Sequence, residues 1–274
     1  MPRFHRLSRP LPSVAFALLA CAAAPLAGAQ SLGPTPFSAG PLAGTAPPGW
    51  IVERPTDTEH ATFYDLVLDG AMHVVQPAPG KRGRPRVVAD PGTIVLRGRA
   101  DGATATLRHG LFADPKQTPI LRWRWRTSHA LDRPDPPPRK PVDDAAAKLC
   151  VFFARKEETM SLKERGLRKF ELARNGRNGP TATLCYVWDG SAPADSVRED
   201  LSGPFLMTIV ATTGHADENR WVSPQRDIAV DYQRAFGEPA PRVTGVSVTV
   251  DTDATGEKTT TWFGDIHFDA RARH

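Results

Sequence analysis

Residues 250–268 read VDTDATGEKTTTWFGDIHF, with polar clusters enclosed by strand-forming residues. The Asp-x-Asp-x-Thr-Gly run from Asp251 to Gly256 matches the first, third, fifth and sixth positions of an EF-hand calcium loop. The match fails at the twelfth position, where a bidentate glutamate is expected and the chain has Trp262. Both flanks are rich in Val, Thr and aromatic residues, which is typical of strands. This stretch is therefore predicted to be a β-hairpin and not an EF-hand.

Two interpretations of the hairpin loop remain open. A calcium site of another class would take carboxylate oxygens from Asp251 and Asp253 and from a distant carboxylate. Asp265, on the return strand, faces either this shared site or the edge of the core. Alternatively, the Asp and Thr side chains bond local backbone amides, and Gly256 accepts a positive φ. Calcium is the one cofactor that the sequence suggests, with Asp251, Asp253 and Asp265 as its candidate ligands.

From Trp50 onward, short runs of strand-forming residues alternate with Gly, Pro and Asp. This pattern favours an antiparallel β-sandwich over alternating β and α units. Two segments have a helical pattern instead. Residues 157–176 are charged and end at Asn-Gly, whereas residues 227–239 place apolar residues at helical spacing and stop at a glycine. We therefore predict a single all-β domain over residues 50–270, with one or two short helices.

The N-terminus has the features of an export signal. Residues 1–29 place three arginines before an apolar stretch and end in Ala-Gly-Ala, a small-x-small cleavage site. Cleavage after Ala29 predicts a periplasmic or secreted protein with no transmembrane span after processing. Alternatively, the Leu-Leu-Ala-Cys run ending at Cys21 matches a lipoprotein box and would anchor the protein there. Residues 30–49, rich in Pro, Gly, Ala and Ser, are expected to form a flexible lead-in.

Charge argues against nucleic acid as a partner. The chain has 35 basic and 30 acidic residues, and three of the arginines lie in the predicted signal peptide, so the processed protein is nearly neutral. Arginines interleaved with aromatic residues suit phosphates and bases, but near-neutrality and export count against that ligand. The eight histidines are scattered, with no pair at ligand spacing on a helix, so the sequence argues against a zinc site. The oligomeric state is left open.

Two cysteines follow the signal segment, and each lies in a predicted strand. Cys150 is in KLCVFFA and Cys185 is in TLCYVW. If the two strands pair in an oxidising compartment, these residues form a disulfide. Alternatively, they are two buried free thiols that act as small hydrophobic residues.

The run LRWRWR contains the candidate ligand-binding strand. Its period-2 alternation places tryptophans on one face, Trp123 and Trp125, and arginines on the other, Arg122, Arg124 and Arg126. Exposed tryptophans would stack on sugar rings, whereas exposed arginines would clamp carboxylate or phosphate groups through paired hydrogen bonds. Only one face can belong to the core. At most one of these two surfaces is therefore available to a ligand.

Four further aspartates are candidate ligand-binding residues: Asp143, Asp144, Asp227 and Asp231. The simplest role for Asp227 is to cap the second helix. A hydrolase would need two carboxylates at a defined separation across a scissile bond, and the sequence does not show that any two converge. It also contains no Gly-x-Ser-x-Gly elbow, His-Glu-x-x-His helix or phosphate-binding Gly-rich loop. No catalytic residue is assigned.

Five segments resemble the family known as domain of unknown function 3047, found in exported bacterial proteins. They are LRWRWR from Leu121, DDAAAKLCVFF from Asp143, CYVW from Cys185, RWVSPQRDIAVDYQRAFG from Arg220 and GVSVTVDTDATGEKTTTWFGDIHF from Gly245. They span most of the processed chain in the family's order. The basic stretch at 156–177 departs from the family as an insertion, and the two cysteines stand where other residues are usual.

The resemblance implies a β-sandwich but no chemistry. The closing WFGDIHF is similar to the last strand of jelly-roll carbohydrate-binding modules, which implies a jelly-roll, galactose-binding-like sandwich. On this basis we expect a non-catalytic binding module, with a saccharide or cell-envelope polymer as its partner. The alternatives are a polysaccharide-acting hydrolase or lyase that uses paired aspartates, and a structural envelope protein.

Overall fold

The computed structural model describes residues 32–55, 60–70, 72–75, 86–89, 93–132, 143–175, 180–200 and 203–272. The predicted signal peptide, with the cleavage site after Ala29 and the alternative anchor at Cys21, lies outside these residues. Residues 31–274 group into one compact unit. No helix within the described ranges is both long and apolar enough to cross a bilayer.

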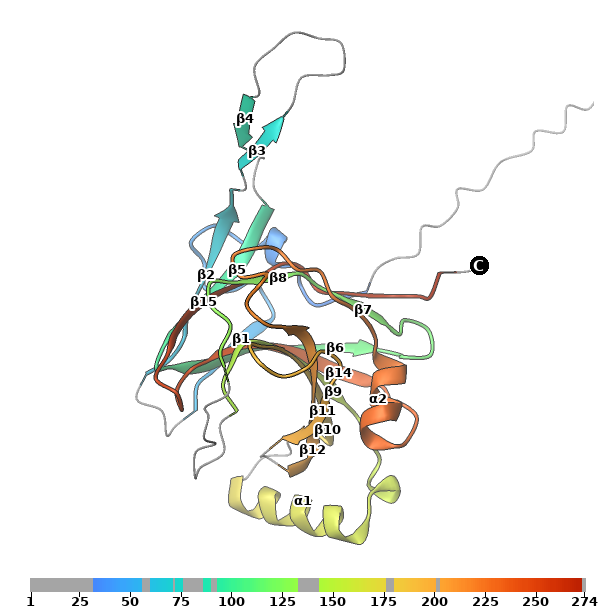
Figure 1. Ribbon diagram of the computed structural model, residues 1–274. Coiled ribbons are helices and arrows are strands. Elements are labelled where there is room, and N and C mark those ends of the chain that lie inside the picture. The colour runs from blue at the N-terminus through green and yellow to red at the C-terminus, as the bar shows by residue number, and fades with distance from the viewer. Residues whose placement is uncertain are drawn as a thin grey trace, which may run out of the picture. The chain divides into compact units, whose positions relative to one another are not determined.

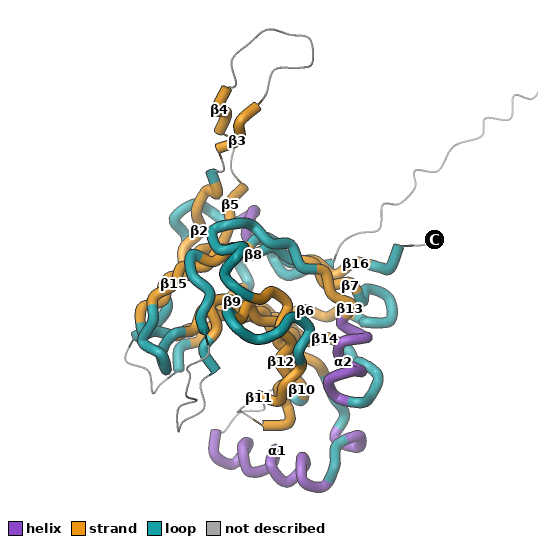
Figure 2. The backbone as a smooth tube through the Cα atoms, viewed as in Figure 1, coloured by secondary structure: helices purple, strands orange, loops and turns teal. Residues whose placement is uncertain are grey.

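Strands are the predominant regular secondary structure of the described chain, as Figures 1 and 2 show. One sheet has seven strands, in the order β1 (Trp50–Glu53), β6 (Thr104–Ala113), β14 (Val243–Asp251), β9 (Ala145–Phe153), β10 (Ala182–Asp189), β12 (Gly203–Thr213) and β11 (Val197–Asp200). All neighbours in it are antiparallel except β10 and β12, which run parallel. A separate pair joins β3 (Met72–Val75) to β4 (Arg86–Ala89).

The facing layer consists of two short sheets that continue one another. One has the order β2 (Phe63–Asp69), β5 (Thr93–Asp101), β15 (Lys258–Phe263) and β8 (Trp125–Thr127), and the other β13 (Gln225–Asp227), β7 (Ile120–Arg122) and β16 (His267–Asp269). Strand β8 follows β7 in the chain, and β16 follows β15. The amide of Gly264 donates to the carbonyl of Arg124 at 2.9 Å, which bridges the break between the two sheets.

Strand β14 illustrates how period-2 alternation separates the two faces of the large sheet. Val246, Val248 and Val250 enter the main hydrophobic core. The intervening residues point to the other face, where the hydroxyl oxygen of Thr249 lies 2.8 Å from that of Thr106. On the same sheet, Cys150 and Cys185 are directly opposite each other in β9 and β10 and are joined by a disulfide.

The predicted fold class, an all-β and largely antiparallel sandwich, is confirmed, with two short helices in the described chain; its jelly-roll, galactose-binding-like type stays a prediction. The first predicted helix begins later than its pattern suggested, with a 3-10 turn (Glu157–Thr159) ahead of α1 (Leu162–Asn175). The second, α2 (Ile228–Phe236), begins at the predicted cap and ends at Gly237 with φ 74°. A left-handed φ of this kind favours glycine because glycine has no Cβ.

The segment predicted as a lead-in contacts the domain where the structure describes it. Leu32 forms a β-bridge with Phe268, and Phe37 is fully buried against the ring of Trp50. Ser38 donates its backbone amide to Asp265 at 3.0 Å. Residues 32–49 therefore contribute to the core and to the hydrogen bonds of the closing hairpin.

Candidate functional site

Residues 121–126, called the arginine strand below, do not form one continuous strand, because Trp123 and Arg124 lie in the break between β7 and β8. The tryptophan face of this segment belongs to the core. Trp123 and Trp125 are 4% and 0% exposed, and their rings contact Tyr186 and Trp188 respectively. The indole N–H of Trp125 donates to the hydroxyl of Thr212 at 3.0 Å. The prediction that Trp123 or Trp125 offers an open ring face for stacking on a ligand is therefore corrected, because both rings are packed against other aromatic side chains in the core. The arginine face is the one left open.

On that open face, arginines alternate with two further tryptophans. The guanidinium carbon of Arg124 lies 4.4 Å from the ring centroid of Trp221, and that of Arg126 lies 4.3 Å from Trp262 and 5.1 Å from Trp221. Asp69 joins the row by pairing with Arg126 at 3.3 Å and accepting the indole N–H of Trp221 at 2.5 Å. These cation–π contacts hold the guanidinium planes at fixed positions.

The side chain of Arg124 crosses directly over Gly264. A Cβ added at Gly264 would lie 2.4 Å from Cγ of Arg124 and 2.5 Å from its Nε. Gly264 therefore leaves room for the Arg124 side chain, because any larger residue at this position would displace Arg124 from the Trp221 ring. The last hairpin and the arginine strand together build this face.

An open hollow of about 360 Å³ lies beside Arg124. Its lining residues are Thr93, Arg122, Trp123, Arg124, Ser223, Asp265 and His267. Arg122 is held by Gln225 at 2.9 Å and by Asp269 at 3.4 Å. Within the described ranges, by contrast, no carboxylate or hydrogen-bond acceptor contacts the Arg124 guanidinium. Its N–H donors are therefore available to an acceptor that enters the hollow.

Three of the predicted aspartates converge at the other end of the closing hairpin. Asp143, Asp144 and Asp251 each place a carboxylate oxygen within 4.8 Å of the other two. Asp251 is buried, its Oδ1 has no hydrogen-bond partner in the described part of the chain, and its Oδ2 lies 4.0 Å from Nζ of Lys148. Burial raises the pKa of Asp251 to about 7; Lys148 opposes the shift and the neighbouring aspartates add to it.

Asp144 also holds the hairpin loop. Its carboxylate accepts the amide of Thr255 at 2.8 Å, the hydroxyl of Thr255 at 2.6 Å and the amide of Ala254 at 3.3 Å. Gly256 follows with φ 71°. The loop amides are thus bonded mainly by an aspartate about 110 residues earlier in the chain, which sequence-local reasoning did not anticipate.

Asp265 does not join this cluster. It lines the arginine hollow instead, where its two carboxylate oxygens accept the amide and the hydroxyl of Ser38. The proposed ligand set is corrected accordingly. The carboxylates that lie beside Asp251 are those of Asp143 and Asp144, not that of Asp265. The negative charge of Asp253 helps to raise the pKa of Asp251.

Asp227 and Asp231 have structural roles. Asp227 caps α2 by accepting the amides of Ala229 and Val230, and it pairs with Arg271 at 2.6 Å. Asp231 is buried and accepts from Arg226 at 2.7 and 2.8 Å and from the hydroxyl of Tyr186 at 2.9 Å. Their assignment as ligand-binding residues is corrected, because these bonds occupy both carboxylates.

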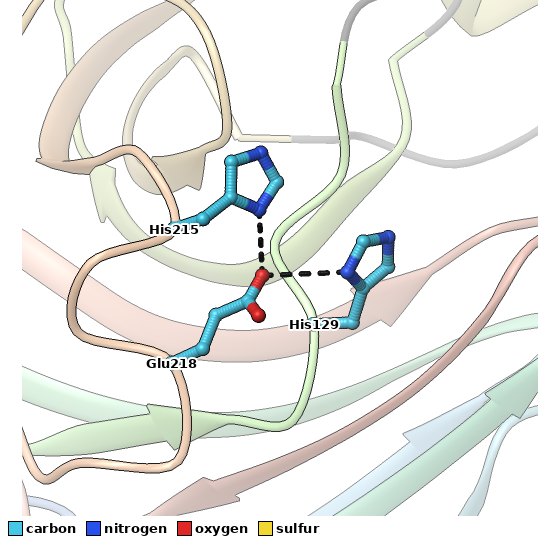
Figure 3. Close-up of side chains that lie close together, drawn as sticks. All are labelled: His129, His215 and Glu218. Carbon is cyan, nitrogen blue, oxygen red and sulfur yellow. Dashed lines mark hydrogen bonds and ion pairs between the residues drawn. The ribbon is translucent and has the colours of Figure 1, made fainter.

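Sequence reasoning missed two sets of residues. Trp221 and Trp262 complete the arginine face, and the signal for Trp262 was its position opposite Arg126 in the β8–β15 pair. The histidines, which appeared scattered, include two whose rings meet at one carboxylate (Figure 3). The sequence feature that could have indicated this cluster is the i,i+3 spacing of His215 and Glu218, but these two residues lie in a loop rather than in a helix.

Comparisons with solved structures return distant β-rich proteins. The K2 cleaved adhesin domain of Lys-gingipain aligns with 10% identity and a TM-score of 0.36, covering 86% of this chain and 97% of that one. The xyloglucanase domain of NopAA from Sinorhizobium fredii, solved with cellobiose, aligns with 8% identity and a TM-score of 0.38, covering 81% and 99%. TmCBM61, solved with β-1,4-galactotriose, aligns with 12% identity and a TM-score of 0.30, covering 82% and 90%.

At these TM-scores and identities the three structures carry no argument about function. No curated protein matches the chain in sequence. Residues 78–267, however, match the model of the family DUF3047, described as a protein of unknown function. That match includes both the arginine strand and the closing hairpin. Because it spans well over half of the sequence, the chain belongs to the DUF3047 family.

Proposed function

We propose that this protein is an exported, non-catalytic binding module whose ligand is an acidic saccharide or another anionic polymer of the cell envelope. The ligand site is the arginine-lined hollow. One observation carries the proposal: Arg124 lies over the ring of Trp221, borders an open hollow of about 360 Å³ and has no acceptor of its own in the described chain.

The chemistry of the hollow suits such a ligand. A guanidinium presents N–H donors in a planar fork that matches a carboxylate or a phosphate. Arg122 adds a second guanidinium, which is paired with Asp269. The hydroxyl-bearing residues Thr93 and Ser223 suit the hydroxyl groups of a sugar. Because Trp221 fixes the guanidinium of Arg124 before the ligand arrives, less side-chain entropy is lost on binding.

Export is part of the same proposal. The predicted signal peptide ends at Ala29, and the Cys150–Cys185 disulfide supports an oxidising compartment, since such bonds are rare in the bacterial cytosol. Secretion can be checked by mass spectrometry of the mature protein, which should begin at Gln30. A lipid-modified Cys21 at its N-terminus would instead indicate a membrane-anchored lipoprotein.

The binding proposal is tested with a panel of acidic and neutral polysaccharides. We expect saturable binding to an acidic member, weakened at least about tenfold by Arg124→Gln and by raising the salt concentration. Arg108→Gln is the matched control, because Arg108 also lies over an aromatic ring, 4.5 Å from Phe152, but belongs to the other sheet. Absence of binding to every acidic member, or equal losses in both variants, would refute the proposal.

A second candidate function is that of a hydrolase or lyase acting on an envelope polymer, favoured by the pKa of Asp251. A carboxyl group with a pKa of about 7 beside Asp143 and Asp144 is able to exchange a proton near neutral pH. Turnover of a polymer that disappears in a folded Asp251→Asn variant would favour this function. No turnover across the panel, together with binding that depends on Arg124, would favour the binding module.

A further inference from the structure

Two loops at the ends of β8 and β12 bring His129, His215 and Glu218 together. His129 follows β8, whereas His215 and Glu218 follow β12. Backbone bonds join the loops, because the amide of Asn219 donates to the carbonyl of Thr127 at 2.8 Å. The amide of Ala130 also donates to Oε1 of Glu218 at 2.8 Å. The cluster is therefore positioned by the sheet rather than by flexible side chains alone.

The three side chains direct their donor atoms to one place. Nδ1 of His215 lies 2.7 Å from Oε1 of Glu218, and Nδ1 of His129 lies 3.3 Å from the same oxygen. Figure 3 shows both rings reaching this carboxylate through one nitrogen each. Two ligands about 2.0–2.1 Å from a tetrahedral metal ion are roughly 3.4 Å apart. The 3.3 Å between His129 and Glu218 is close to that value, whereas the 2.7 Å between His215 and Glu218 is a hydrogen-bond distance that a bound ion would widen.

The far nitrogen of each imidazole has its own carboxylate. Nε2 of His215 lies 3.0 Å from Oδ1 of Asp132, and Nε2 of His129 lies 3.2 Å from Oε2 of Glu257. A neutral imidazole that donates Nε2–H to such a carboxylate presents a lone pair at Nδ1. Metal-binding histidines are held in this way, with an outer carboxylate fixing the tautomer and orientation of the ring. The arrangement occurs twice, from two separate segments of the chain.

With both histidines in that tautomer, two nitrogen lone pairs and a carboxylate face one point. Their repulsion is relieved when a cation lies between them. Two imidazoles and one carboxylate are the donor set of zinc and related divalent transition metals. The histidine side chains are 44% and 41% exposed, so solvent has access to a further coordination position.

We propose that His129, His215 and Glu218 bind a divalent transition metal of the zinc class, with Asp132 and Glu257 orienting the two imidazoles. The metal connects the loop after β8 to the loop after β12. The proposal is independent of the arginine hollow, which uses none of these residues.

The test is a titration of chelator-treated full-length protein, carrying no histidine tag, with Zn²⁺ by calorimetry and with Co²⁺ by visible absorption. We expect one equivalent to bind, a cobalt spectrum of four- or five-coordinate geometry, and a rise in the melting temperature, because the metal binds the folded state. Asp132→Asn and Glu257→Gln should each weaken binding about 10- to 100-fold. His129→Ala, His215→Ala and Glu218→Gln should weaken it further.

The exposed His60 lies outside the cluster, so His60→Ala is the matched control and should bind as the unmodified chain does. Circular dichroism of each metal-free variant establishes that it folds. Two results would overturn the proposal: no stoichiometric binding of either metal, or unchanged affinity in a folded His129→Ala/His215→Ala double variant. If both histidines are instead protonated and bound to the carboxylates, neither metal will bind, which is the first of these results.

Discussion

The guanidinium of Arg124 lies 4.4 Å above the ring of Trp221, and only a glycine at position 264 lets its side chain cross the hairpin to reach that ring. The two halves of the proposed ligand site, the arginine strand and the closing hairpin, are therefore coupled at one contact. A change in the hairpin should affect the ligand site even though it removes no ligand-binding group.

Gly264→Ala tests this coupling. The added Cβ would overlap the side chain of Arg124, so we expect a loss of about 1–3 kcal/mol in the free energy of unfolding, as for other overpacked sites. Weaker binding of the acidic ligand should accompany it. Urea denaturation measures the first effect and a binding titration the second. Gly110→Ala is the control, because a Cβ there has no neighbour within 4 Å; equal effects of both changes would contradict the coupling.

Arg226→Ala should be among the most damaging single changes. It would leave Asp231, which is 5% exposed, without its guanidinium partner, while the hydroxyl of Tyr186 is its remaining neutral donor. Removing one partner of a buried ion pair costs about 3–5 kcal/mol, because the other charge stays buried. The double variant Arg226→Ala/Asp231→Asn should recover part of this loss in urea denaturation. No recovery would show that the loss has another origin.

Stability should depend on pH through Asp251. Its folded-state pKa of about 7 lies above the unfolded value, so the folded protein holds a proton that the unfolded chain releases. This contribution is fully present below about pH 4 and is lost as the pH rises through 7. The loss is at most on the order of 4 kcal/mol, since one pKa unit corresponds to about 1.4 kcal/mol.

The Asp251→Asn variant should therefore show a flatter profile of unfolding free energy between pH 5 and 8. It should also be more stable than the unmodified chain at pH 8, because no charge is then buried. Asp101→Asn is the control, because Asp101 is 65% exposed and pairs with Lys258 at the surface. A profile that keeps its slope in Asp251→Asn would rule out this carboxyl group as the cause.

Calcium should raise the melting temperature at pH 8, where Asp251 is ionised. Hard cations favour carboxylate oxygens, and Asp143, Asp144 and Asp251 supply three within 4.8 Å of one another. A concentration about 100 times the dissociation constant adds about 2.7 kcal/mol to stability. Asp251→Asn should abolish the shift, whereas Asp265→Asn should retain it, because Ser38 already occupies that carboxylate. The reverse pattern would restore Asp265 as a ligand.

The sequence by itself determined the elements and their faces. Period-2 alternation was sufficient to place Trp123 and Trp125 opposite Arg124, and the glycine and aspartate around α2 were sufficient to delimit that helix. These features depend on residues that are neighbours in the chain, so local sterics and burial decide them.

Tertiary structure alone decided which face was core and which distant residues meet. Trp221 reaches Arg124 because the next residue, Val222, forms a β-bridge with Trp125, which follows Arg124 in the chain. Asp144 reaches the hairpin loop across about 110 residues, and His129 meets His215 across more than 80. Strand order brings these groups together, and it is set by packing of the whole sheet, which no local pattern encodes.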